Sequence, residues 1–148
     1  MAYAIMDALI GSQPIAVTST VQNHPLGTIV CAKDPTYGVG EFIYLVGVAS
    51  TAVGSWVKYM EDGFTTSLLA ANDIGQVAVA MSANVASQYG WYQIKGKAIG
   101  KALASYADNG LVYATATAGS IDDAVVSGDR VKKALGGYAF DRAGRVRD

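Results

Sequence analysis

Hydrophobic residues recur along the chain in short runs that are interrupted by glycine, by proline or by the Asp62-Gly63 turn pair. Three runs show this most clearly, at Phe42–Val48, Gln76–Met81 and Gly90–Lys97. They are rich in valine, isoleucine and aromatic residues, which favour β-strands. Successive runs lie about 8–12 residues apart with turn residues between them, a spacing typical of a β-sandwich or barrel. The pattern therefore predicts an all-β protein, a compact β-barrel or β-sandwich with an extended N-terminal arm.

Two of these runs predict how their strands are buried. Phe42–Val48 is apolar at consecutive positions, as expected of a strand that is buried on both faces. Gly90–Ala98 alternates, and Lys95 and Lys97 share a side with Trp91, which predicts a half-buried strand with a solvated basic face. The expected core strands are Phe42–Val48, Trp56–Tyr59, Val77–Met81 and Tyr92–Ile94.

The ends of the chain differ from its middle. We divide the sequence into an arm at residues 1–26, a β-domain at 27–140 and a polar tail at 141–148. Within the arm, Ala2–Ile10 favours a short helix that Gly11–Pro14 would end, whereas Ile15–Val21 alternates as an extended segment does. We interpret the arm as a segment that lies on another surface.

The composition indicates a surface that is partly covered. Charged residues make up 16% and hydrophobic residues 51% of the 148 residues, whereas an average globular domain is about 25% charged. Such a chain leaves apolar surface exposed as a monomer, so we expect copies of itself or another protein to cover part of it. The net charge of −1 provides no basic field for nucleic acid. No apolar run is long enough to span a bilayer, and we expect no membrane partner.

Residues able to perform chemistry are scarce. His24 and Cys31 are the only histidine and cysteine, too few for a zinc site, and we expect no metal and no cofactor. We interpret Cys31 as a small buried hydrophobe rather than a nucleophile, and a lone cysteine fits a reducing compartment. Glu41 and Glu61 leave open an acid pair of the kind that glycoside hydrolases use. The favoured prediction is that the protein is not an enzyme.

Three segments resemble known proteins. Gly27–Asp34, Gly40–Ala49 and Gly90–Ala98 resemble small structural proteins of tailed bacteriophages, in particular the capsid decoration (cement) proteins of virion heads. The resemblance extends over roughly Gly27 to Leu135. It implies a non-enzymatic β-domain that is made in the host cytoplasm and placed on the capsid surface of the virion. There it would bind the major capsid protein, bridge neighbouring subunits and associate with itself, as a homotrimer in preference to a dimer.

On this interpretation the arm and one strand supply the contacts. The expected capsid or subunit contacts are Tyr3, Ile5, Ile10, Ile15, Val17, Trp91, Lys95 and Lys97.

Two alternatives remain open from the sequence. A β-sheet module for single-stranded nucleic acid would stack bases on Trp91 and Tyr92 and bind phosphates through Lys95, Lys97 and Lys101, although we do not expect nucleic acid as a partner. The other alternative is a different virion component, such as a head fibre or a tail protein.

Overall fold

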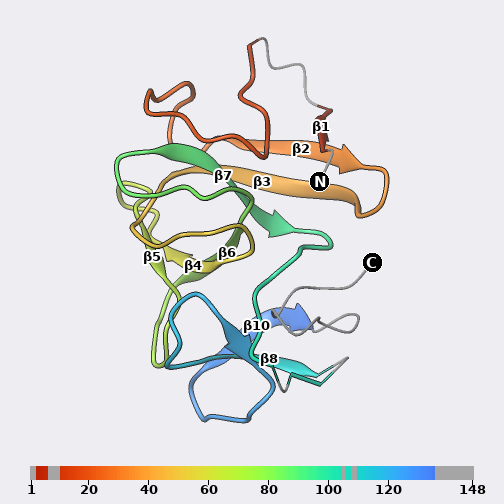
Figure 1. The fold of residues 1–148 in the computed structure, drawn as a ribbon, viewed down its shortest axis with the longest axis vertical. Coiled ribbons are helices and arrows are strands. Elements are labelled where there is room, and N and C mark those ends of the chain that lie inside the picture. The colour runs from red at the N-terminus through yellow and green to blue at the C-terminus, as the bar shows by residue number, and fades with distance from the viewer. Residues whose placement is uncertain (1–2, 7–10, 105, 108–109, 136–148) are drawn as a thin grey trace.

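The structure is a computed structural model that describes residues 3–6, 11–104, 106–107 and 110–135, with side chains as far as residue 132. Within these ranges every regular element is a β-strand, which confirms the predicted all-β class (Figure 1). A seven-stranded sheet and a three-stranded sheet lie one above the other along the longest axis. The strands are β1 (Ala4–Ile5), β2 (Ile29–Asp34), β3 (Gly38–Val46), β4 (Trp56–Tyr59), β5 (Thr66–Leu68), β6 (Gln76–Ala80), β7 (Tyr89–Lys95), β8 (Leu111–Ala114), β9 (Ile121–Asp122) and β10 (Arg130–Leu135).

The large sheet is antiparallel and curls back on itself. Its strand order is β1-β2-β3-β7-β6-β4-β5, and Glu41 and Phe42 of β3 pair with Lys95 and Gln93, which leaves Ile94 of β7 as a bulge. The curl brings the chain around β5 to the end of β3. There the N–H of Val46 donates to the Phe64 carbonyl (N···O 3.4 Å), and the Thr66 hydroxyl donates to the Val46 carbonyl at 2.7 Å. Strands β3, β7, β6, β4 and β5 thus form a partly closed barrel.

The concave side of this sheet is filled by side chains from β3, β4, β6 and β7. Asn84 is fully buried against them and donates through Nδ2 to the Tyr92 hydroxyl at 3.2 Å and to the Leu45 carbonyl at 3.3 Å. A Cβ at Gly47 would collide with the carbonyl oxygens of Asn84 and Val85, so this close approach requires glycine. The buried apolar residues are Ile43, Leu45, Val57, Tyr59, Ala78, Ala80 and Tyr92.

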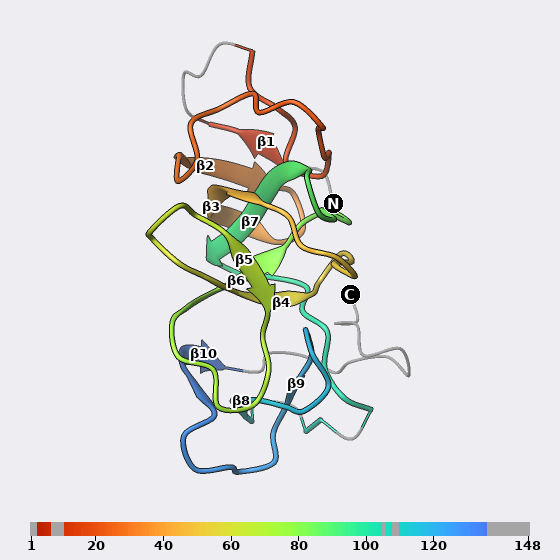
Figure 2. The same ribbon diagram turned by 90° about the vertical axis from the view of Figure 1, so that its left-hand side faces the viewer.

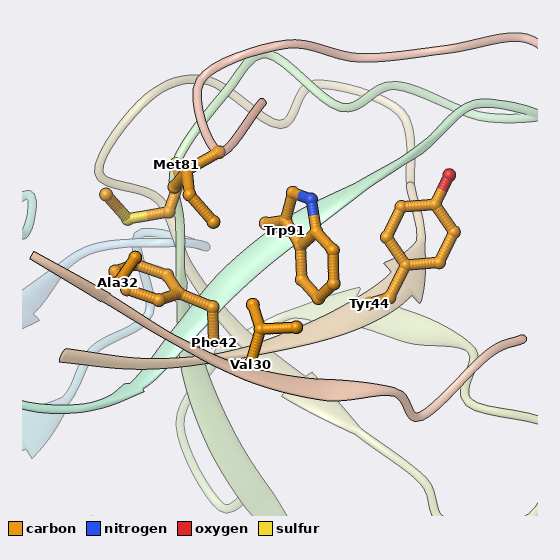
Figure 3. Packing of buried hydrophobic residues seen from close by; sticks show 7 residues of the cluster. Val30, Ala32, Phe42, Tyr44, Met81 and Trp91 are labelled. Carbon is orange, nitrogen blue, oxygen red and sulfur yellow. The ribbon is translucent and has the colours of Figure 1, made fainter. Parts of the chain in front are cut away.

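The convex side of the sheet carries a second apolar cluster on β2, β3 and β7. Figure 3 shows Trp91 between Phe42 and Tyr44 above these strands, with Met81 nearby. Because the chain before β2 covers this cluster, β3 is buried on both faces from Phe42 to Leu45, where each residue is at most 4% exposed. The prediction of a doubly buried strand at Phe42–Val48 is confirmed for its first four residues. The buried members are Ile15, Val30, Ala32, Phe42, Tyr44, Met81 and Trp91.

The small sheet, in the order β10-β8-β9, covers another part of the convex side (Figure 2). Trp56 of β4 and Val77 of β6 pack against its apolar cluster. Backbone hydrogen bonds join the two sheets, from the Trp56 N–H to the Gly119 carbonyl (3.0 Å) and from the Gly119 N–H to the Leu69 carbonyl (2.8 Å). The cluster consists of Leu69, Ala102, Tyr106, Val112, Ala114, Ile121 and Val131.

The prediction of a helix over Ala2–Ile10 is wrong at the described residues. Ala4–Ile5 forms the edge strand β1, in register with Lys33 and Ala32 of β2, and the Met6 N–H continues the pairing by donating to the Cys31 carbonyl at 2.8 Å. A helix this short is marginal in water, whereas the open edge of β2 offers hydrogen-bond partners at once.

The prediction of a solvated basic face on β7 is also wrong. Trp91 and Gln93 are 0% and 3% exposed, because the N-terminal chain lies over the side of β7 that they share. The strand ends at Lys95, so the exposed lysine positions lie at and beyond its end rather than along its face.

Candidate functional site

Residues 11–26, which we call the strap, cross the convex side of the large sheet above β2, β3 and β7 (Figures 1 and 2). Ile15 is 2% exposed and packs into the cluster of Phe42 and Trp91. Ser19 forms a bridge with Tyr89, in which each N–H donates to the other's carbonyl at 3.0 and 2.8 Å. The sequence predicted an arm that lies on another surface, and the described strap lies on the chain's own sheet.

Gln13 is the centre of the contacts that hold the strap. Its Oε1 accepts hydrogen bonds from the Tyr44 hydroxyl at 2.7 Å and from Asn23 Nδ2 at 2.9 Å. Its Nε2 donates to the carbonyls of Val17 at 2.6 Å and Tyr89 at 3.1 Å. Its backbone carbonyl accepts from the indole Nε1 of Trp91 at 2.8 Å. Because Gln13 is only 5% exposed, these bonds replace water at every polar atom of its side chain.

His24 completes this network. Its Nε2 accepts the backbone N–H of Gln13 at 2.9 Å, so that nitrogen carries no proton and the ring is neutral. Its ring meets Tyr44 edge-on at 5.1 Å between centroids and lies tilted to Trp91 at 5.4 Å. Burial lowers the pKa of His24 below its ordinary value.

The arm residues predicted as contacts occupy different environments. Tyr3 meets Phe42 edge-on at 4.8 Å between centroids, and Ile5 packs on the same cluster half-buried. Ile15 is buried in the chain's own core, whereas Val17 is 47% exposed on the strap. Ile10 lies outside the described residues. The exposed candidate of this group is therefore Val17.

The three residues predicted around β7 are also separated. Trp91 is buried beneath the strap, so its side chain contacts the chain's own strands. Lys95 is exposed and forms an ion pair with Glu41 at 3.5 Å. Lys97 Nζ lies 5.8 Å from the centre of the Tyr37 ring, and its carbonyl accepts the hydroxyl of Tyr3 at 3.2 Å. The structure thus brings Tyr3 and Lys97 together but removes Trp91 from the surface.

Part of the exposed apolar surface lies at the two ends of the longest axis, whereas other side chains that are 50–59% exposed lie outside the strap and the loop after β9, namely Met6, Ile29, Val39, Val53 and Met60. At one end the strap presents Val17 and Val21, which is 66% exposed. At the other end the loop after β9 presents Val125 and Val126, 79% and 47% exposed. Figure 1 shows the strap at the top of the molecule and the β9–β10 loop at the bottom.

The β5–β6 loop belongs to this second end. The Asn72 N–H donates to Asp129 Oδ1 at 2.6 Å, which ties the loop to the chain between β9 and β10. Two residues further on, Ile74 is 88% exposed. We call Val17 and Val21 the strap end, and Ile74, Val125 and Val126 the loop end. Among the described residues, the three most exposed large apolar side chains, Ile74, Val125 and Val21, all lie at these ends.

A groove of about 1080 Å³ runs between the two sheets. Apolar residues such as Val77, Ile94 and Val131 line it together with three carboxylates. Each carboxylate has a partner of its own: Glu41 pairs with Lys95, Asp73 with Lys58 at 2.6 Å, and Asp129 with the Asn72 N–H. Within the described ranges, no group of three or more His, Cys, Asp or Glu residues is placed to hold a metal ion.

The geometry also bears on the alternative functions. Trp91 and Tyr92 are both fully buried, so neither ring offers a face on which a base could stack. Glu41 and Glu61 have separate partners, since Glu61 accepts a hydrogen bond from Gln76 Nε2 and Glu41 pairs with Lys95.

Sequence reasoning missed the residues that anchor the strap and those of the loop end. Gln13 and His24 stand beside prolines in a polar stretch and resemble ordinary loop residues. The pair Val125-Val126 had a usable signal, because two apolar residues lie between turn-forming residues with no strand pattern around them. Ile74 had none, since only the fold brings its loop to Asp129.

Comparison with known proteins adds no relative. No protein-family model matches the chain, and neither a curated protein nor a solved structure is significantly similar to it. Among the described residues there is no helix that is long and apolar enough to cross a membrane. Function is therefore inferred from the surfaces of this chain.

Proposed function

We propose that this chain is a virion structural protein that binds the outer surface of a phage capsid and bridges neighbouring major capsid subunits. The observation that carries the proposal is the placement of the most exposed apolar side chains at the strap end and the loop end of one elongated β-domain. The resemblance of Gly27–Asp34, Gly40–Ala49 and Gly90–Ala98 to capsid decoration proteins supports the same function.

Two separated apolar ends suit a bridging role. Burial of one large aliphatic side chain contributes roughly 1.5–3 kcal/mol, so each end supplies a weak contact. A rigid β-domain that joins both contacts makes the second one intramolecular, which raises the overall affinity far above that of either end alone. The large sheet and the small sheet would act as a spacer that separates the two capsid contacts.

The proposal specifies partners and location. The partners are the major capsid protein and further copies of this chain, with a homotrimer in preference to a dimer. The location is the capsid surface of the virion, and the chain performs no reaction there. Light scattering on the purified protein gives its mass in solution, and a stable trimer is the expected result.

Analysis of purified particles tests the assignment. Virions of the phage whose genome encodes this chain are purified on a gradient, and mass spectrometry measures the copies of this chain per copy of the major capsid protein. A ratio near the number of subunit junctions per copy of the major capsid protein supports decoration. Absence from intact heads, or confinement to tails or fibres, contradicts it.

Variants test the role of the ends. Ile74→Ser combined with Val125→Ser alters the loop end, and Val39→Ser with Val53→Ser is a matched control at side chains that are 54% and 50% exposed elsewhere. Heads that lack the chain are mixed with each protein and sedimented. We expect the loop-end variant to bind at least tenfold more weakly and the control to bind normally, since 1.4 kcal/mol corresponds to about tenfold. Equal binding of both variants would contradict bridging through the loop end.

A further inference from the structure

The way in which the strap is attached suggests a regulated contact. We propose that the strap is a pH-operated latch, in which proton uptake at His24 detaches residues 11–26 and uncovers the aromatic surface of β3 and β7. This inference concerns the strap alone and holds whether or not the chain binds a capsid.

The first step rests on the geometry of His24. Its Nε2 accepts the Gln13 N–H at 2.9 Å, and a backbone N–H can only donate. When Nε2 gains a proton, two N–H groups point at each other and the hydrogen bond is lost. Since Gln13 also holds Tyr44 and Trp91, displacement of its backbone disturbs the whole network.

The second step concerns the groups around the ring. The contacts of His24 come from Gln13 and Gln22 of the strap, Tyr44 of β3 and Trp91 of β7. Tyr44 is the titratable group among these contacts, and burial raises its pKa, so it stays uncharged in acid. These described contacts provide no carboxylate that would stabilise an imidazolium ion.

The direction of the pH effect follows from these contacts. The attached strap holds His24 neutral, with a pKa below the ordinary value of 6.5 that a released strap would have. Release therefore takes up a proton, and the latch weakens as pH falls below about 6.5. The equilibrium shifts toward release by at most about tenfold for each pH unit, as expected for one proton.

The third step concerns what remains when the latch opens. The other attachments of the described strap include Ile15 and Leu26 in the apolar cluster, the Ser19–Tyr89 bridge, and the Asn23 N–H, which donates to the Tyr44 hydroxyl at 3.3 Å. Gly27 follows directly, with a φ of +83° that favours glycine, and its N–H donates to the Tyr44 carbonyl at 2.8 Å, so the chain stays attached to β3 where the strap ends. Detachment would leave Tyr44 and Trp91 facing solvent while Tyr3 stays on Phe42, and exposed apolar patches are typical of protein interaction surfaces.

Tryptophan fluorescence can follow the latch directly. The chain has two tryptophans, so Trp56→Phe leaves Trp91 as the single probe. Emission and acrylamide quenching of Trp91 are measured from about pH 8 to about pH 4, a range that spans the titration of histidine, while far-ultraviolet circular dichroism monitors the sheets. We expect a red shift and a severalfold rise in quenching below about pH 6.5 with the β signal retained.

The control variant is His24→Gln, which keeps a hydrogen-bond acceptor at the end of the side chain but takes up no proton. It should remain latched across the same range. An identical transition in this variant, or no transition in the parent protein, would overturn the proposal.

A second measurement does not depend on His24→Gln, because its deciding value is taken from the parent protein. Because His24 is the only histidine, its ring proton gives a single assignable NMR signal. The latch requires a titration midpoint below 6.5 for His24 in the folded protein. In Gln13→Ala, which loosens the strap, this midpoint should move upward. A midpoint at or above 6.5 in the parent protein would overturn the proposal.

Discussion

Two regions of the convex side of the large sheet are covered in different ways. Over β3 and β7, the strap is held by a polar network in which every polar atom of the Gln13 side chain has a partner. Over β4 and β6, the small sheet is held by an apolar cluster together with backbone hydrogen bonds at Gly119, and Trp56 Nε1 there is buried without a partner among the described residues. Hydrogen bonds are directional, and one acceptor of this network, His24 Nε2, can take up a proton. A fall in pH can therefore release the strap. The apolar cover has no such trigger and serves stability.

The largest effect is expected where the cover is apolar. Ile121 is 1% exposed in the small-sheet cluster, so Ile121→Ala creates a cavity and should lower the free energy of unfolding by about 3 kcal/mol. Urea denaturation followed by circular dichroism measures this change. Val125→Ala is the control, because a side chain that is 79% exposed should change stability by less than about 0.5 kcal/mol. Similar values for the two variants would mean that the cluster does not hold the small sheet.

The next effect is expected at the centre of the strap network. Gln13→Ala leaves the Tyr44 hydroxyl proton without its acceptor and removes one of the two hydrogen bonds to the Tyr89 carbonyl, and we expect a loss of about 2 kcal/mol, with Trp91 more accessible to acrylamide. Gln22→Ala, on an exposed residue of the same strap, is the matched control and should cost less than about 0.5 kcal/mol. An unchanged Trp91 signal in Gln13→Ala would show that Gln13 does not hold the strap.

A smaller effect is expected when one hydroxyl of the network is removed. Tyr44→Phe abolishes the 2.7 Å bond to Gln13 and should cost about 1 kcal/mol. Tyr59→Phe removes the 2.6 Å bond to Gln76, an exposed residue whose amide can bond water instead, and should cost about 0.5 kcal/mol or less. If urea denaturation gave the same loss of unfolding free energy for both variants, the buried network would contribute no more than the part-buried bond of Tyr59.

The smallest effect is expected at the ion pair of the β5–β6 loop. Burial opposes the charged form of Asp73, but the hydrogen bond and charge of Lys58, together with the Ala70 N–H, hold its pKa below the ordinary 3.8. Its contribution is therefore present above about pH 4 and is lost as pH falls further. Asp73→Asn should lower the free energy of unfolding by about 0.5 kcal/mol at neutral pH. Below about pH 4 the stability of this variant should depend less on pH than that of the parent protein. If the fluorescence transition of the strap disappeared in Asp73→Asn, the transition would depend on Asp73 and not on His24, which would contradict the latch.

Much of the fold could be predicted from the sequence. Consecutive apolar residues at Phe42–Val48 indicated a strand buried on both faces, and Asp62-Gly63 indicated the turn between β4 and β5. These features are local, since they depend on strand propensity and turn chemistry. The alternation along Gly90–Ala98 located a strand but not its environment, because a segment more than 60 residues earlier in the chain covers Trp91.

The candidate site could be predicted only in part. Val17 was identified and is exposed, whereas Ile15 and Trp91 were identified and lie in the core. Gln13, His24 and Tyr44 come together only when the strap folds over β3, and a single sequence contains no spacing rule for that contact. The loop end likewise depends on the hydrogen bond between Asn72 and Asp129, which joins two loops 57 positions apart.

Electron cryomicroscopy of purified virions tests the central claim most directly, since it shows both ends of the molecule at once. The expected result is density for this chain over the junction of two major capsid subunits, with the strap end on one subunit and the loop end on the other. Heads without this density, or density that contacts the capsid through neither end, would contradict it.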